Sequence, residues 1–83
     1  MKRSQRVTWS RQGNIHVMRD GYGWIRAFVY MDGEEGRLLD SYIALCPLNF
    51  GELRPWSYQE RNCRKIKAKC AALWRGIAEK ADL

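Results

Sequence analysis

Aliphatic residues alternate with three aromatic residues and one arginine along residues 24–31, a segment that contains no Gly or Pro. In a strand, one face would carry Ile25, Ala27, Val29 and Met31, and the other would carry Trp24, Arg26, Phe28 and Tyr30. Clusters of Asp and Gly, typical of turns, flank this segment at residues 20–23 and 32–36. Apolar stretches at residues 15–18 and 38–46 predict strands on either side, and residues 7–9 form a further short candidate.

A different pattern, with apolar residues three and four positions apart, runs through the last third of the chain. Its members are Cys63, Ile66, Cys70, Leu73, Trp74, Ile77 and Ala81, which share an arc of about 100° on a helix. Ser57 and Glu60 have the spacing of a capping box, and Pro55 disfavours an earlier start. We therefore predict a helix over residues 57–81 that packs on the aliphatic face of the sheet.

Together these elements predict a single α+β domain over residues 1–83, in which an antiparallel three- to four-stranded meander packs against one long C-terminal α-helix. Residues 1–12 form a basic N-terminal arm, or a short strand, and residues 14–46 form the sheet. Residues 47–56 form a loop, and residues 57–81 form the helix. No apolar run approaches the roughly 20 residues that a membrane span needs, so we expect no membrane partner.

The chemistry-bearing residues are few. The three cysteines, Cys46, Cys63 and Cys70, are an odd number without an export signal, which favours a reducing, cytoplasmic location. His16 is the sole histidine, and no spacing pairs it with a nucleophile or with metal-ligand partners. We therefore expect a protein that is not an enzyme and that needs no metal or cofactor.

Charge is strongly segregated along the chain, whose net charge is +6. Residues 1–19 hold five Lys or Arg and no acid, residues 20–60 hold three against seven acids, and residues 61–83 hold seven against two. A basic helix and a basic arm can bind phosphates without reading sequence, because each contact releases a counterion. This pattern predicts a nucleic-acid-binding module that uses Lys2, Arg3, Arg6, Arg61, Arg64, Lys65, Lys69 and Arg75.

The alternative hypothesis is a protein-interaction module. A sheet with one helix leaves its second face uncovered, and there Trp24, Arg26, Phe28 and Tyr30 would form an exposed patch that anchors a partner. The acidic turn with Asp32, Glu34 and Glu35 would instead pair with a basic partner, as a mimic of phosphates. A homodimer through the aromatic face, or its burial by residues 7–9 or by residues 47–55, are the further alternatives.

The order of strand, strand, strand and helix over residues 14–81 resembles small DNA-binding domains such as integrase arm-binding modules, and also the C-terminal half of double-stranded-RNA-binding domains. The small size and the segregated charge resemble small phage-encoded inhibitors, including anti-CRISPR proteins. The first resemblance implies nucleic-acid binding, and the second implies docking on a host protein or nucleoprotein. Both concern topology and type without a shared motif, so no residue role is carried over.

Overall fold

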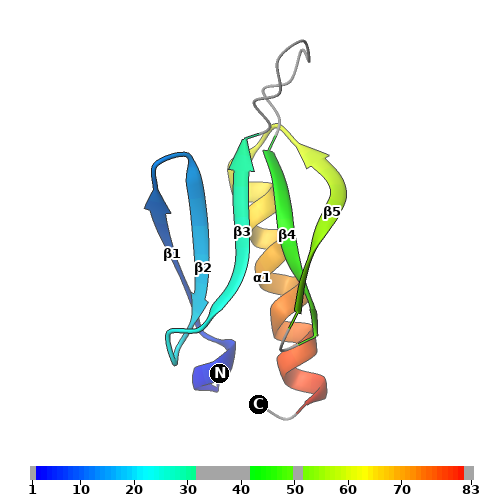
Figure 1. The fold of residues 1–83 in the computed structure, drawn as a ribbon. Coiled ribbons are helices and arrows are strands. Elements are labelled where there is room, and N and C mark those ends of the chain that lie inside the picture. Colours follow the sequence, from blue (N-terminus) through cyan, green and yellow to red (C-terminus); the bar gives the residue numbers. More distant parts are fainter. Residues whose placement is uncertain (1, 32–41, 50–51, 82–83) are drawn as a thin grey trace.

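The computed structural model describes residues 2–31, 42–49 and 52–81 (Figure 1). In chain order it has a short 3-10 helix η1 (Arg3–Gln5), five strands and one α-helix. The strands are β1 (Val7–Gln12), β2 (Ile15–Asp20), β3 (Ile25–Met31), β4 (Tyr42–Asn49) and β5 (Glu52–Glu60), and the helix is α1 (Cys63–Lys80). The predicted α+β class is confirmed, with five strands where the sequence predicted three to four.

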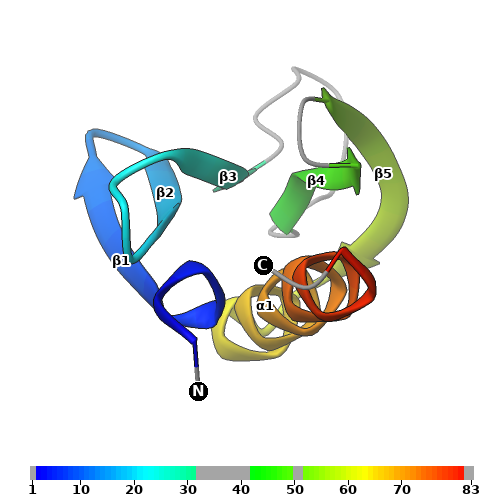
Figure 2. The same ribbon diagram turned by 90° about the horizontal axis from the view of Figure 1, so that it is seen from below.

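The five strands form one antiparallel sheet in the order β1-β2-β3-β4-β5, so each strand pairs with its neighbour in the chain. Viewed along its length, the sheet curves around α1, and α1 lies on the concave side (Figure 2). The N-terminal helix η1 lies beside the C-terminal half of α1, close to the β2–β3 turn (Figure 1). The meander and the single covering helix are therefore both as predicted.

Small side chains on both surfaces bring α1 close to the sheet. The core contains Met18, Ala27, Val29, Ala44 and Cys46 from the strands, and Ile66, Cys70, Ala71, Trp74 and Ala78 from α1. The alanines on either side leave room for Trp74, which is the largest fully buried side chain. Leu73, which the helical stripe placed in the core, is instead 40 % exposed, because the buried face is centred nearer Ala71 and Ala78.

The predicted loop at residues 47–56 and the predicted helix start at Ser57 are both wrong. Residues 42–49 and 52–60 form the β4–β5 hairpin, and α1 begins at Cys63. Asn62 caps α1, since its Oδ1 accepts hydrogen bonds from the backbone N–H groups of Arg64 (3.0 Å) and Lys65 (3.3 Å). Pro55 is tolerated in a strand because β5 lies at the edge of the sheet.

A β-bulge at Arg26 changes which residues of β3 face the core. Met18 pairs with Ala27, but the next residue, Arg19, pairs with Ile25, so Arg26 is an extra residue on β3. Arg26 therefore points toward α1 together with Ala27, and Ile25 lies 40 % exposed. The strict alternation predicted for residues 24–31 thus holds for Ala27 and Val29 and fails at Ile25 and Arg26; the side chain of Met31 is outside the described part.

Candidate nucleic-acid interface

Four of the predicted phosphate-binding residues lie exposed on the N-terminal half of α1 or just before it. These are Arg61, Arg64, Lys65 and Lys69. The Asn62 cap fixes the first turn on which Arg64 and Lys65 stand. The unpaired N–H groups of a helix N-terminus carry partial positive charge, which adds to the potential of these side chains.

The predicted N-terminal arm is folded onto the rest of the molecule. The carbonyl oxygen of Ser4 accepts a hydrogen bond from Trp74 Nε1 at 2.7 Å, and that of Gln5 accepts one from Arg75 Nε at 3.1 Å. Arg75 is consequently half-buried rather than fully outward-facing as predicted. The exposed cations Lys2, Arg3 and Arg6 are thereby held at fixed positions beside α1.

Arg3 ties the same segment to the β2–β3 turn. Its Nε donates to the carbonyl oxygen of Gly21 at 3.0 Å, and the N–H of Gly21 donates to the carbonyl oxygen of Arg3 at 3.0 Å. Its guanidinium Cζ lies 4.9 Å from the centroid of the Tyr22 ring. A Cβ atom at position 21 would overlap the Arg3 carbonyl, so the approach requires glycine there.

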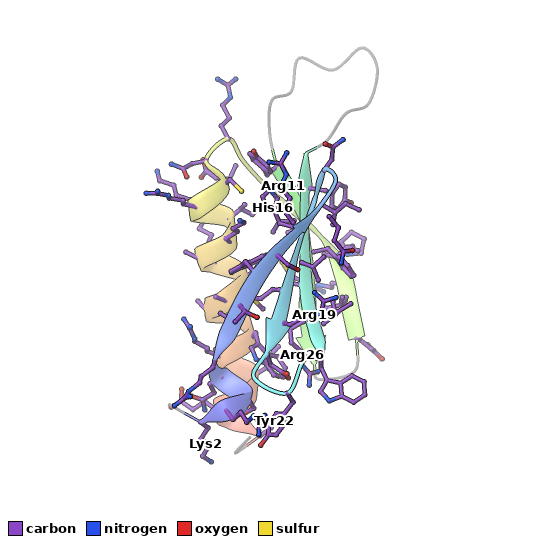
Figure 3. All side chains as sticks on the ribbon, turned by 90° about the vertical axis from the view of Figure 1, so that its left-hand side faces the viewer. Lys2, Arg11, His16, Arg19, Tyr22 and Arg26 are labelled. Carbon is purple, nitrogen blue, oxygen red and sulfur yellow. The ribbon has the colours of Figure 1, made fainter. Side chains whose placement is uncertain are left out.

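A further group of cations lies where the edge strand β1 meets α1. Lys67 on α1 places its Nζ 5.2 Å from the centroid of the Trp9 ring on β1. Arg11 on β1 pairs in register with His16 on β2. We call the strip that follows this junction the β1–α1 seam; its residues are Lys2, Arg3, Arg6, Arg11, Lys67 and Arg75. Figure 3 shows Lys2 at one end of this side of the molecule and Arg11 at the other.

His16 points inward near the upper end of the seam (Figure 3) and is half-buried. Its ring meets Tyr42 edge-on at a centroid distance of 6.2 Å, and its Nε2 lies 3.9 Å from Cys63 Sγ. Burial lowers the pKa of His16 below its usual value of 6.5, and the charges of Lys67 and Arg11 lower that pKa further. The lowered pKa favours the neutral form of the imidazole.

Arg26, assigned by the sequence to an exposed aromatic face, is part of an internal cluster instead. Its Nε donates to Asp20 Oδ2 at 2.9 Å, and its Cζ lies 4.1 Å from the centroid of the Trp74 ring. Asp20 is 3 % exposed, and its other carboxylate oxygen accepts from the backbone N–H groups of Tyr22 and Trp24. Arg26 and Asp20 neutralise each other beneath the β2–β3 turn, and this excludes Arg26 from the predicted contact patch.

The other members of that patch are only partly accessible. Trp24 is 67 % exposed, but Phe28 and Tyr30 are half-buried in the outer face of the sheet, beside the buried Val17. α1 lies on the opposite face (Figure 2). Asp32, Glu34 and Glu35, the predicted acidic turn, lie outside the described residues.

Positive charge dominates the part of the chain that the structure describes. Residues 2–31, 42–49 and 52–81 contain fourteen Lys and Arg but only four acids, namely Asp20, Glu52, Glu60 and Glu79. Of these four, Asp20 is buried against Arg26. The whole chain has fifteen Lys and Arg against nine Asp and Glu, which gives a net charge of +6.

The cysteines are free thiols, two of which touch in the core. Cys46 Sγ and Cys70 Sγ are 3.5 Å apart, whereas Cys63 stands half-buried beside His16. Within residues 2–31, 42–49 and 52–81, no cluster of three or more His, Cys, Asp or Glu side chains could hold a metal ion. In the same ranges, no helix has the length and apolar character needed to cross a bilayer.

No protein-family model matches the chain, and neither the curated proteins nor the solved structures that were compared with it gave a significant match. The functional argument for this chain consequently starts from its own geometry and charge.

Sequence reasoning missed the seam residues Trp9, Arg11 and Lys67. Lys67 flanks the apolar stripe of α1, and a cation at the border of such a stripe indicates a partner at the edge of the core. Arg11 faces the same way as Trp9, two residues before it, and the Gly13-Asn14 turn brings both beside β2. If the alternation had been followed through residues 7–12, the side chains of Trp9 and Arg11 would have been placed on the face toward the helix.

Proposed function

We propose that the protein is a non-enzymatic nucleic-acid-binding module that contacts phosphates through α1 and the β1–α1 seam. The observation that carries this proposal is the concentration of exposed Lys and Arg side chains on α1 and along the seam, in a chain whose net charge is +6. The cations on α1 or just before it are Arg61, Arg64, Lys65 and Lys69, and those on the seam are Lys2, Arg3, Arg6, Arg11, Lys67 and Arg75.

The dimensions support several simultaneous phosphate contacts. α1 has 18 residues and is about 27 Å long at 1.5 Å per residue, and successive phosphates along one strand of a duplex rise about 3.4 Å. The seam runs beside α1 and is fixed at one end by the hydrogen bonds to Ser4 and Gln5 and at the other by the Lys67–Trp9 contact. Because the backbone that carries these cations is already fixed, binding would require little ordering of the main chain.

A salt series tests this proposal. Fluorescence anisotropy with a labelled oligonucleotide at about 50 to 300 mM salt should give a steep fall in affinity, with log K declining by about 0.9 per phosphate contact for a duplex. The double variant Arg64→Gln/Lys65→Gln should make the slope of log K against log salt shallower by the equivalent of about two phosphate contacts. Arg54→Gln, which removes an exposed charge at the opposite edge of the sheet, is the matched control and should leave the slope nearly unchanged.

The result that would overturn the proposal is affinity that does not depend on salt, or equal effects of the Arg64→Gln/Lys65→Gln and Arg54→Gln variants. We further infer a cytoplasmic location, which the odd number of cysteines supports.

The second candidate function is docking on a protein, in the manner of a phage-type inhibitor or of a homodimer. It is favoured by the outer face of the sheet, where Ile15 and Ile25 are 42 % and 40 % exposed and Phe28 is half-buried. Phe28→Ala that leaves the fold intact but abolishes self-association or partner binding would support this candidate. Loss of the folded state in Phe28→Ala would instead assign the ring to the fold.

A further inference from the structure

The β2–β3 turn, residues Asp20 to Trp24, is held in one conformation by a buried carboxylate. Asp20 Oδ1 accepts from the N–H groups of Tyr22 at 2.9 Å and Trp24 at 3.1 Å. The Asp20 backbone closes the turn, because its N–H donates to the Trp24 carbonyl and its carbonyl accepts from Gly23, both at 3.0 Å. Gly23 has φ +91°, which an L side chain adopts only with strain.

The turn displays two large aromatic rings rather than burying them. Tyr22 is 61 % exposed and Trp24 is 67 % exposed, the highest values among the large hydrophobic residues of the described part. Their backbones are fixed by the same carboxylate, so contact with a ligand would cost little backbone freedom. We call these two residues and the turn that carries them the aromatic turn.

The surroundings of the aromatic turn are cationic. Arg3 packs over Tyr22, and the exposed Lys2 precedes it on the neighbouring segment (Figure 3). Asp20, the one acid within the turn, is buried and paired with Arg26. Flat rings beside fixed cations suit a ligand that alternates aromatic faces with phosphates.

We propose that the aromatic turn stacks against unpaired bases of a single-stranded nucleic acid, whose phosphates contact Lys2 and Arg3 and continue along the β1–α1 seam. This inference rests on the proposed function and specifies its substrate class. Inside a duplex both faces of each base are covered by neighbouring bases, so only single strands, loops or ends offer a free face to Tyr22 and Trp24. The rings would therefore confer a preference for unpaired over paired nucleic acid, which the cations alone do not provide.

The test compares two labelled DNA oligonucleotides of the same base composition, a single strand of about 12 nucleotides and a fully paired duplex. Trp24→Ala and Tyr22→Ala should each weaken single-strand binding by roughly five- to a hundred-fold and duplex binding by less than about twofold. Trp24→Phe keeps an aromatic ring and should restore most of the single-strand affinity. Ile15→Ala, which removes a comparably exposed apolar side chain at the other end of β2, is the matched control and should have no effect on either DNA.

Each remaining outcome is decisive. If Trp24→Ala and Tyr22→Ala leave single-strand affinity unchanged while Arg64→Gln/Lys65→Gln lowers it, the stacking role is wrong and the proposed function stands. If they weaken both DNAs equally, or if Trp24→Ala changes only self-association in sedimentation, the turn does not read unpaired bases and the inference is overturned. If the unaltered protein shows no salt-dependent binding to either DNA, the proposed function fails and this inference fails with it.

Discussion

The guanidinium Cζ of Arg26 lies 4.1 Å from the centroid of the Trp74 ring, where it joins the sheet to α1. The contact exists because the bulge in β3 turns Arg26 toward the helix. Asp20 supplies the opposite charge from beneath the β2–β3 turn. One arginine thus links the turn, the sheet and the helix.

Replacing Arg26 should destabilise the fold strongly. Arg26→Met keeps an unbranched side chain over Trp74 but leaves the Asp20 carboxylate buried without its cation, since the Asp20 side chain is 1 % exposed. We expect the free energy of unfolding to fall by about 3–5 kcal/mol, as measured by urea denaturation followed by circular dichroism. Adding Asp20→Asn should recover part of the loss, and a single variant as stable as the unaltered protein would contradict the proposed role.

Removing the indole N–H of Trp74 should release the N-terminal segment. Trp74→Phe retains an aromatic ring in the core but cannot donate to the Ser4 carbonyl, where the present bond is 2.7 Å. We expect a loss of about 1–3 kcal/mol, together with faster amide hydrogen exchange at Gln5 and Arg6, whose N–H groups bond within η1. Unchanged exchange at these two amides would show that η1 is held by other contacts.

The pKa of His16 should report on the seam. Burial, Lys67 and Arg11 together lower the pKa of His16 below 6.5, and NMR titration of this sole histidine measures it directly. Lys67→Gln should raise the pKa, because one of the lowering charges is removed. A bound oligonucleotide on the seam should raise it too, since nearby phosphates favour the protonated ring; no change on binding would mean that nucleic acid lies elsewhere.

The same shift predicts the direction of a pH effect on stability. Below pH 6.5 the unfolded chain protonates His16, whereas its lowered pKa in the folded state resists protonation, so the unfolded state binds more protons. Stability should therefore fall as pH drops from about 6.5 through the folded-state pKa. His16→Gln should remove this contribution, and denaturation midpoints at several pH values compare the two proteins.

Thiol reactivity should separate the three cysteines. Cys63 is half-buried, whereas Cys46 is 4 % exposed and Cys70 is fully buried. The hydrogen bond with Cys46 and burial both raise the pKa of Cys70 well above its usual value, and the bond from Cys70 lowers the pKa of Cys46. Iodoacetamide with mass spectrometry should modify Cys63 first in the folded protein and all three in urea; early labelling of Cys70 would contradict the buried contact.

The sequence predicted the elements whose signal is repeated over many residues. The stripe from Cys63 to Ile77 predicted α1, and the alternation of Ala27 and Val29 predicted the core face of β3. In contrast, Ser57 and Glu60 matched a capping box by chance spacing, and Pro47 and Pro55 suggested a loop. Proline is accommodated here because the pairing of β3 with β4 ends at Leu45, short of Pro47, and because β5 is an edge strand.

Only the exposed helix residues of the candidate site could be predicted from the sequence. Arg61, Arg64 and Lys65 could be placed outward from helical periodicity alone. Arg26 could not, because a single bulge reverses the facing of the residues before it and leaves no local signal in the sequence. The docking of η1 also depends on contacts between residues 70 positions apart, which periodicity does not encode.

Those two hydrogen bonds, from Trp74 to Ser4 and from Arg75 to Gln5, also constrain when the molecule can finish folding. During synthesis residues 3–5 emerge long before their partners, so they have nowhere to dock until Trp74 and Arg75 have also left the ribosome. The β1–β3 hairpins can pair earlier, because their partners are close in sequence. A nascent chain would thus present an incomplete cationic surface until Trp74 and Arg75 have emerged.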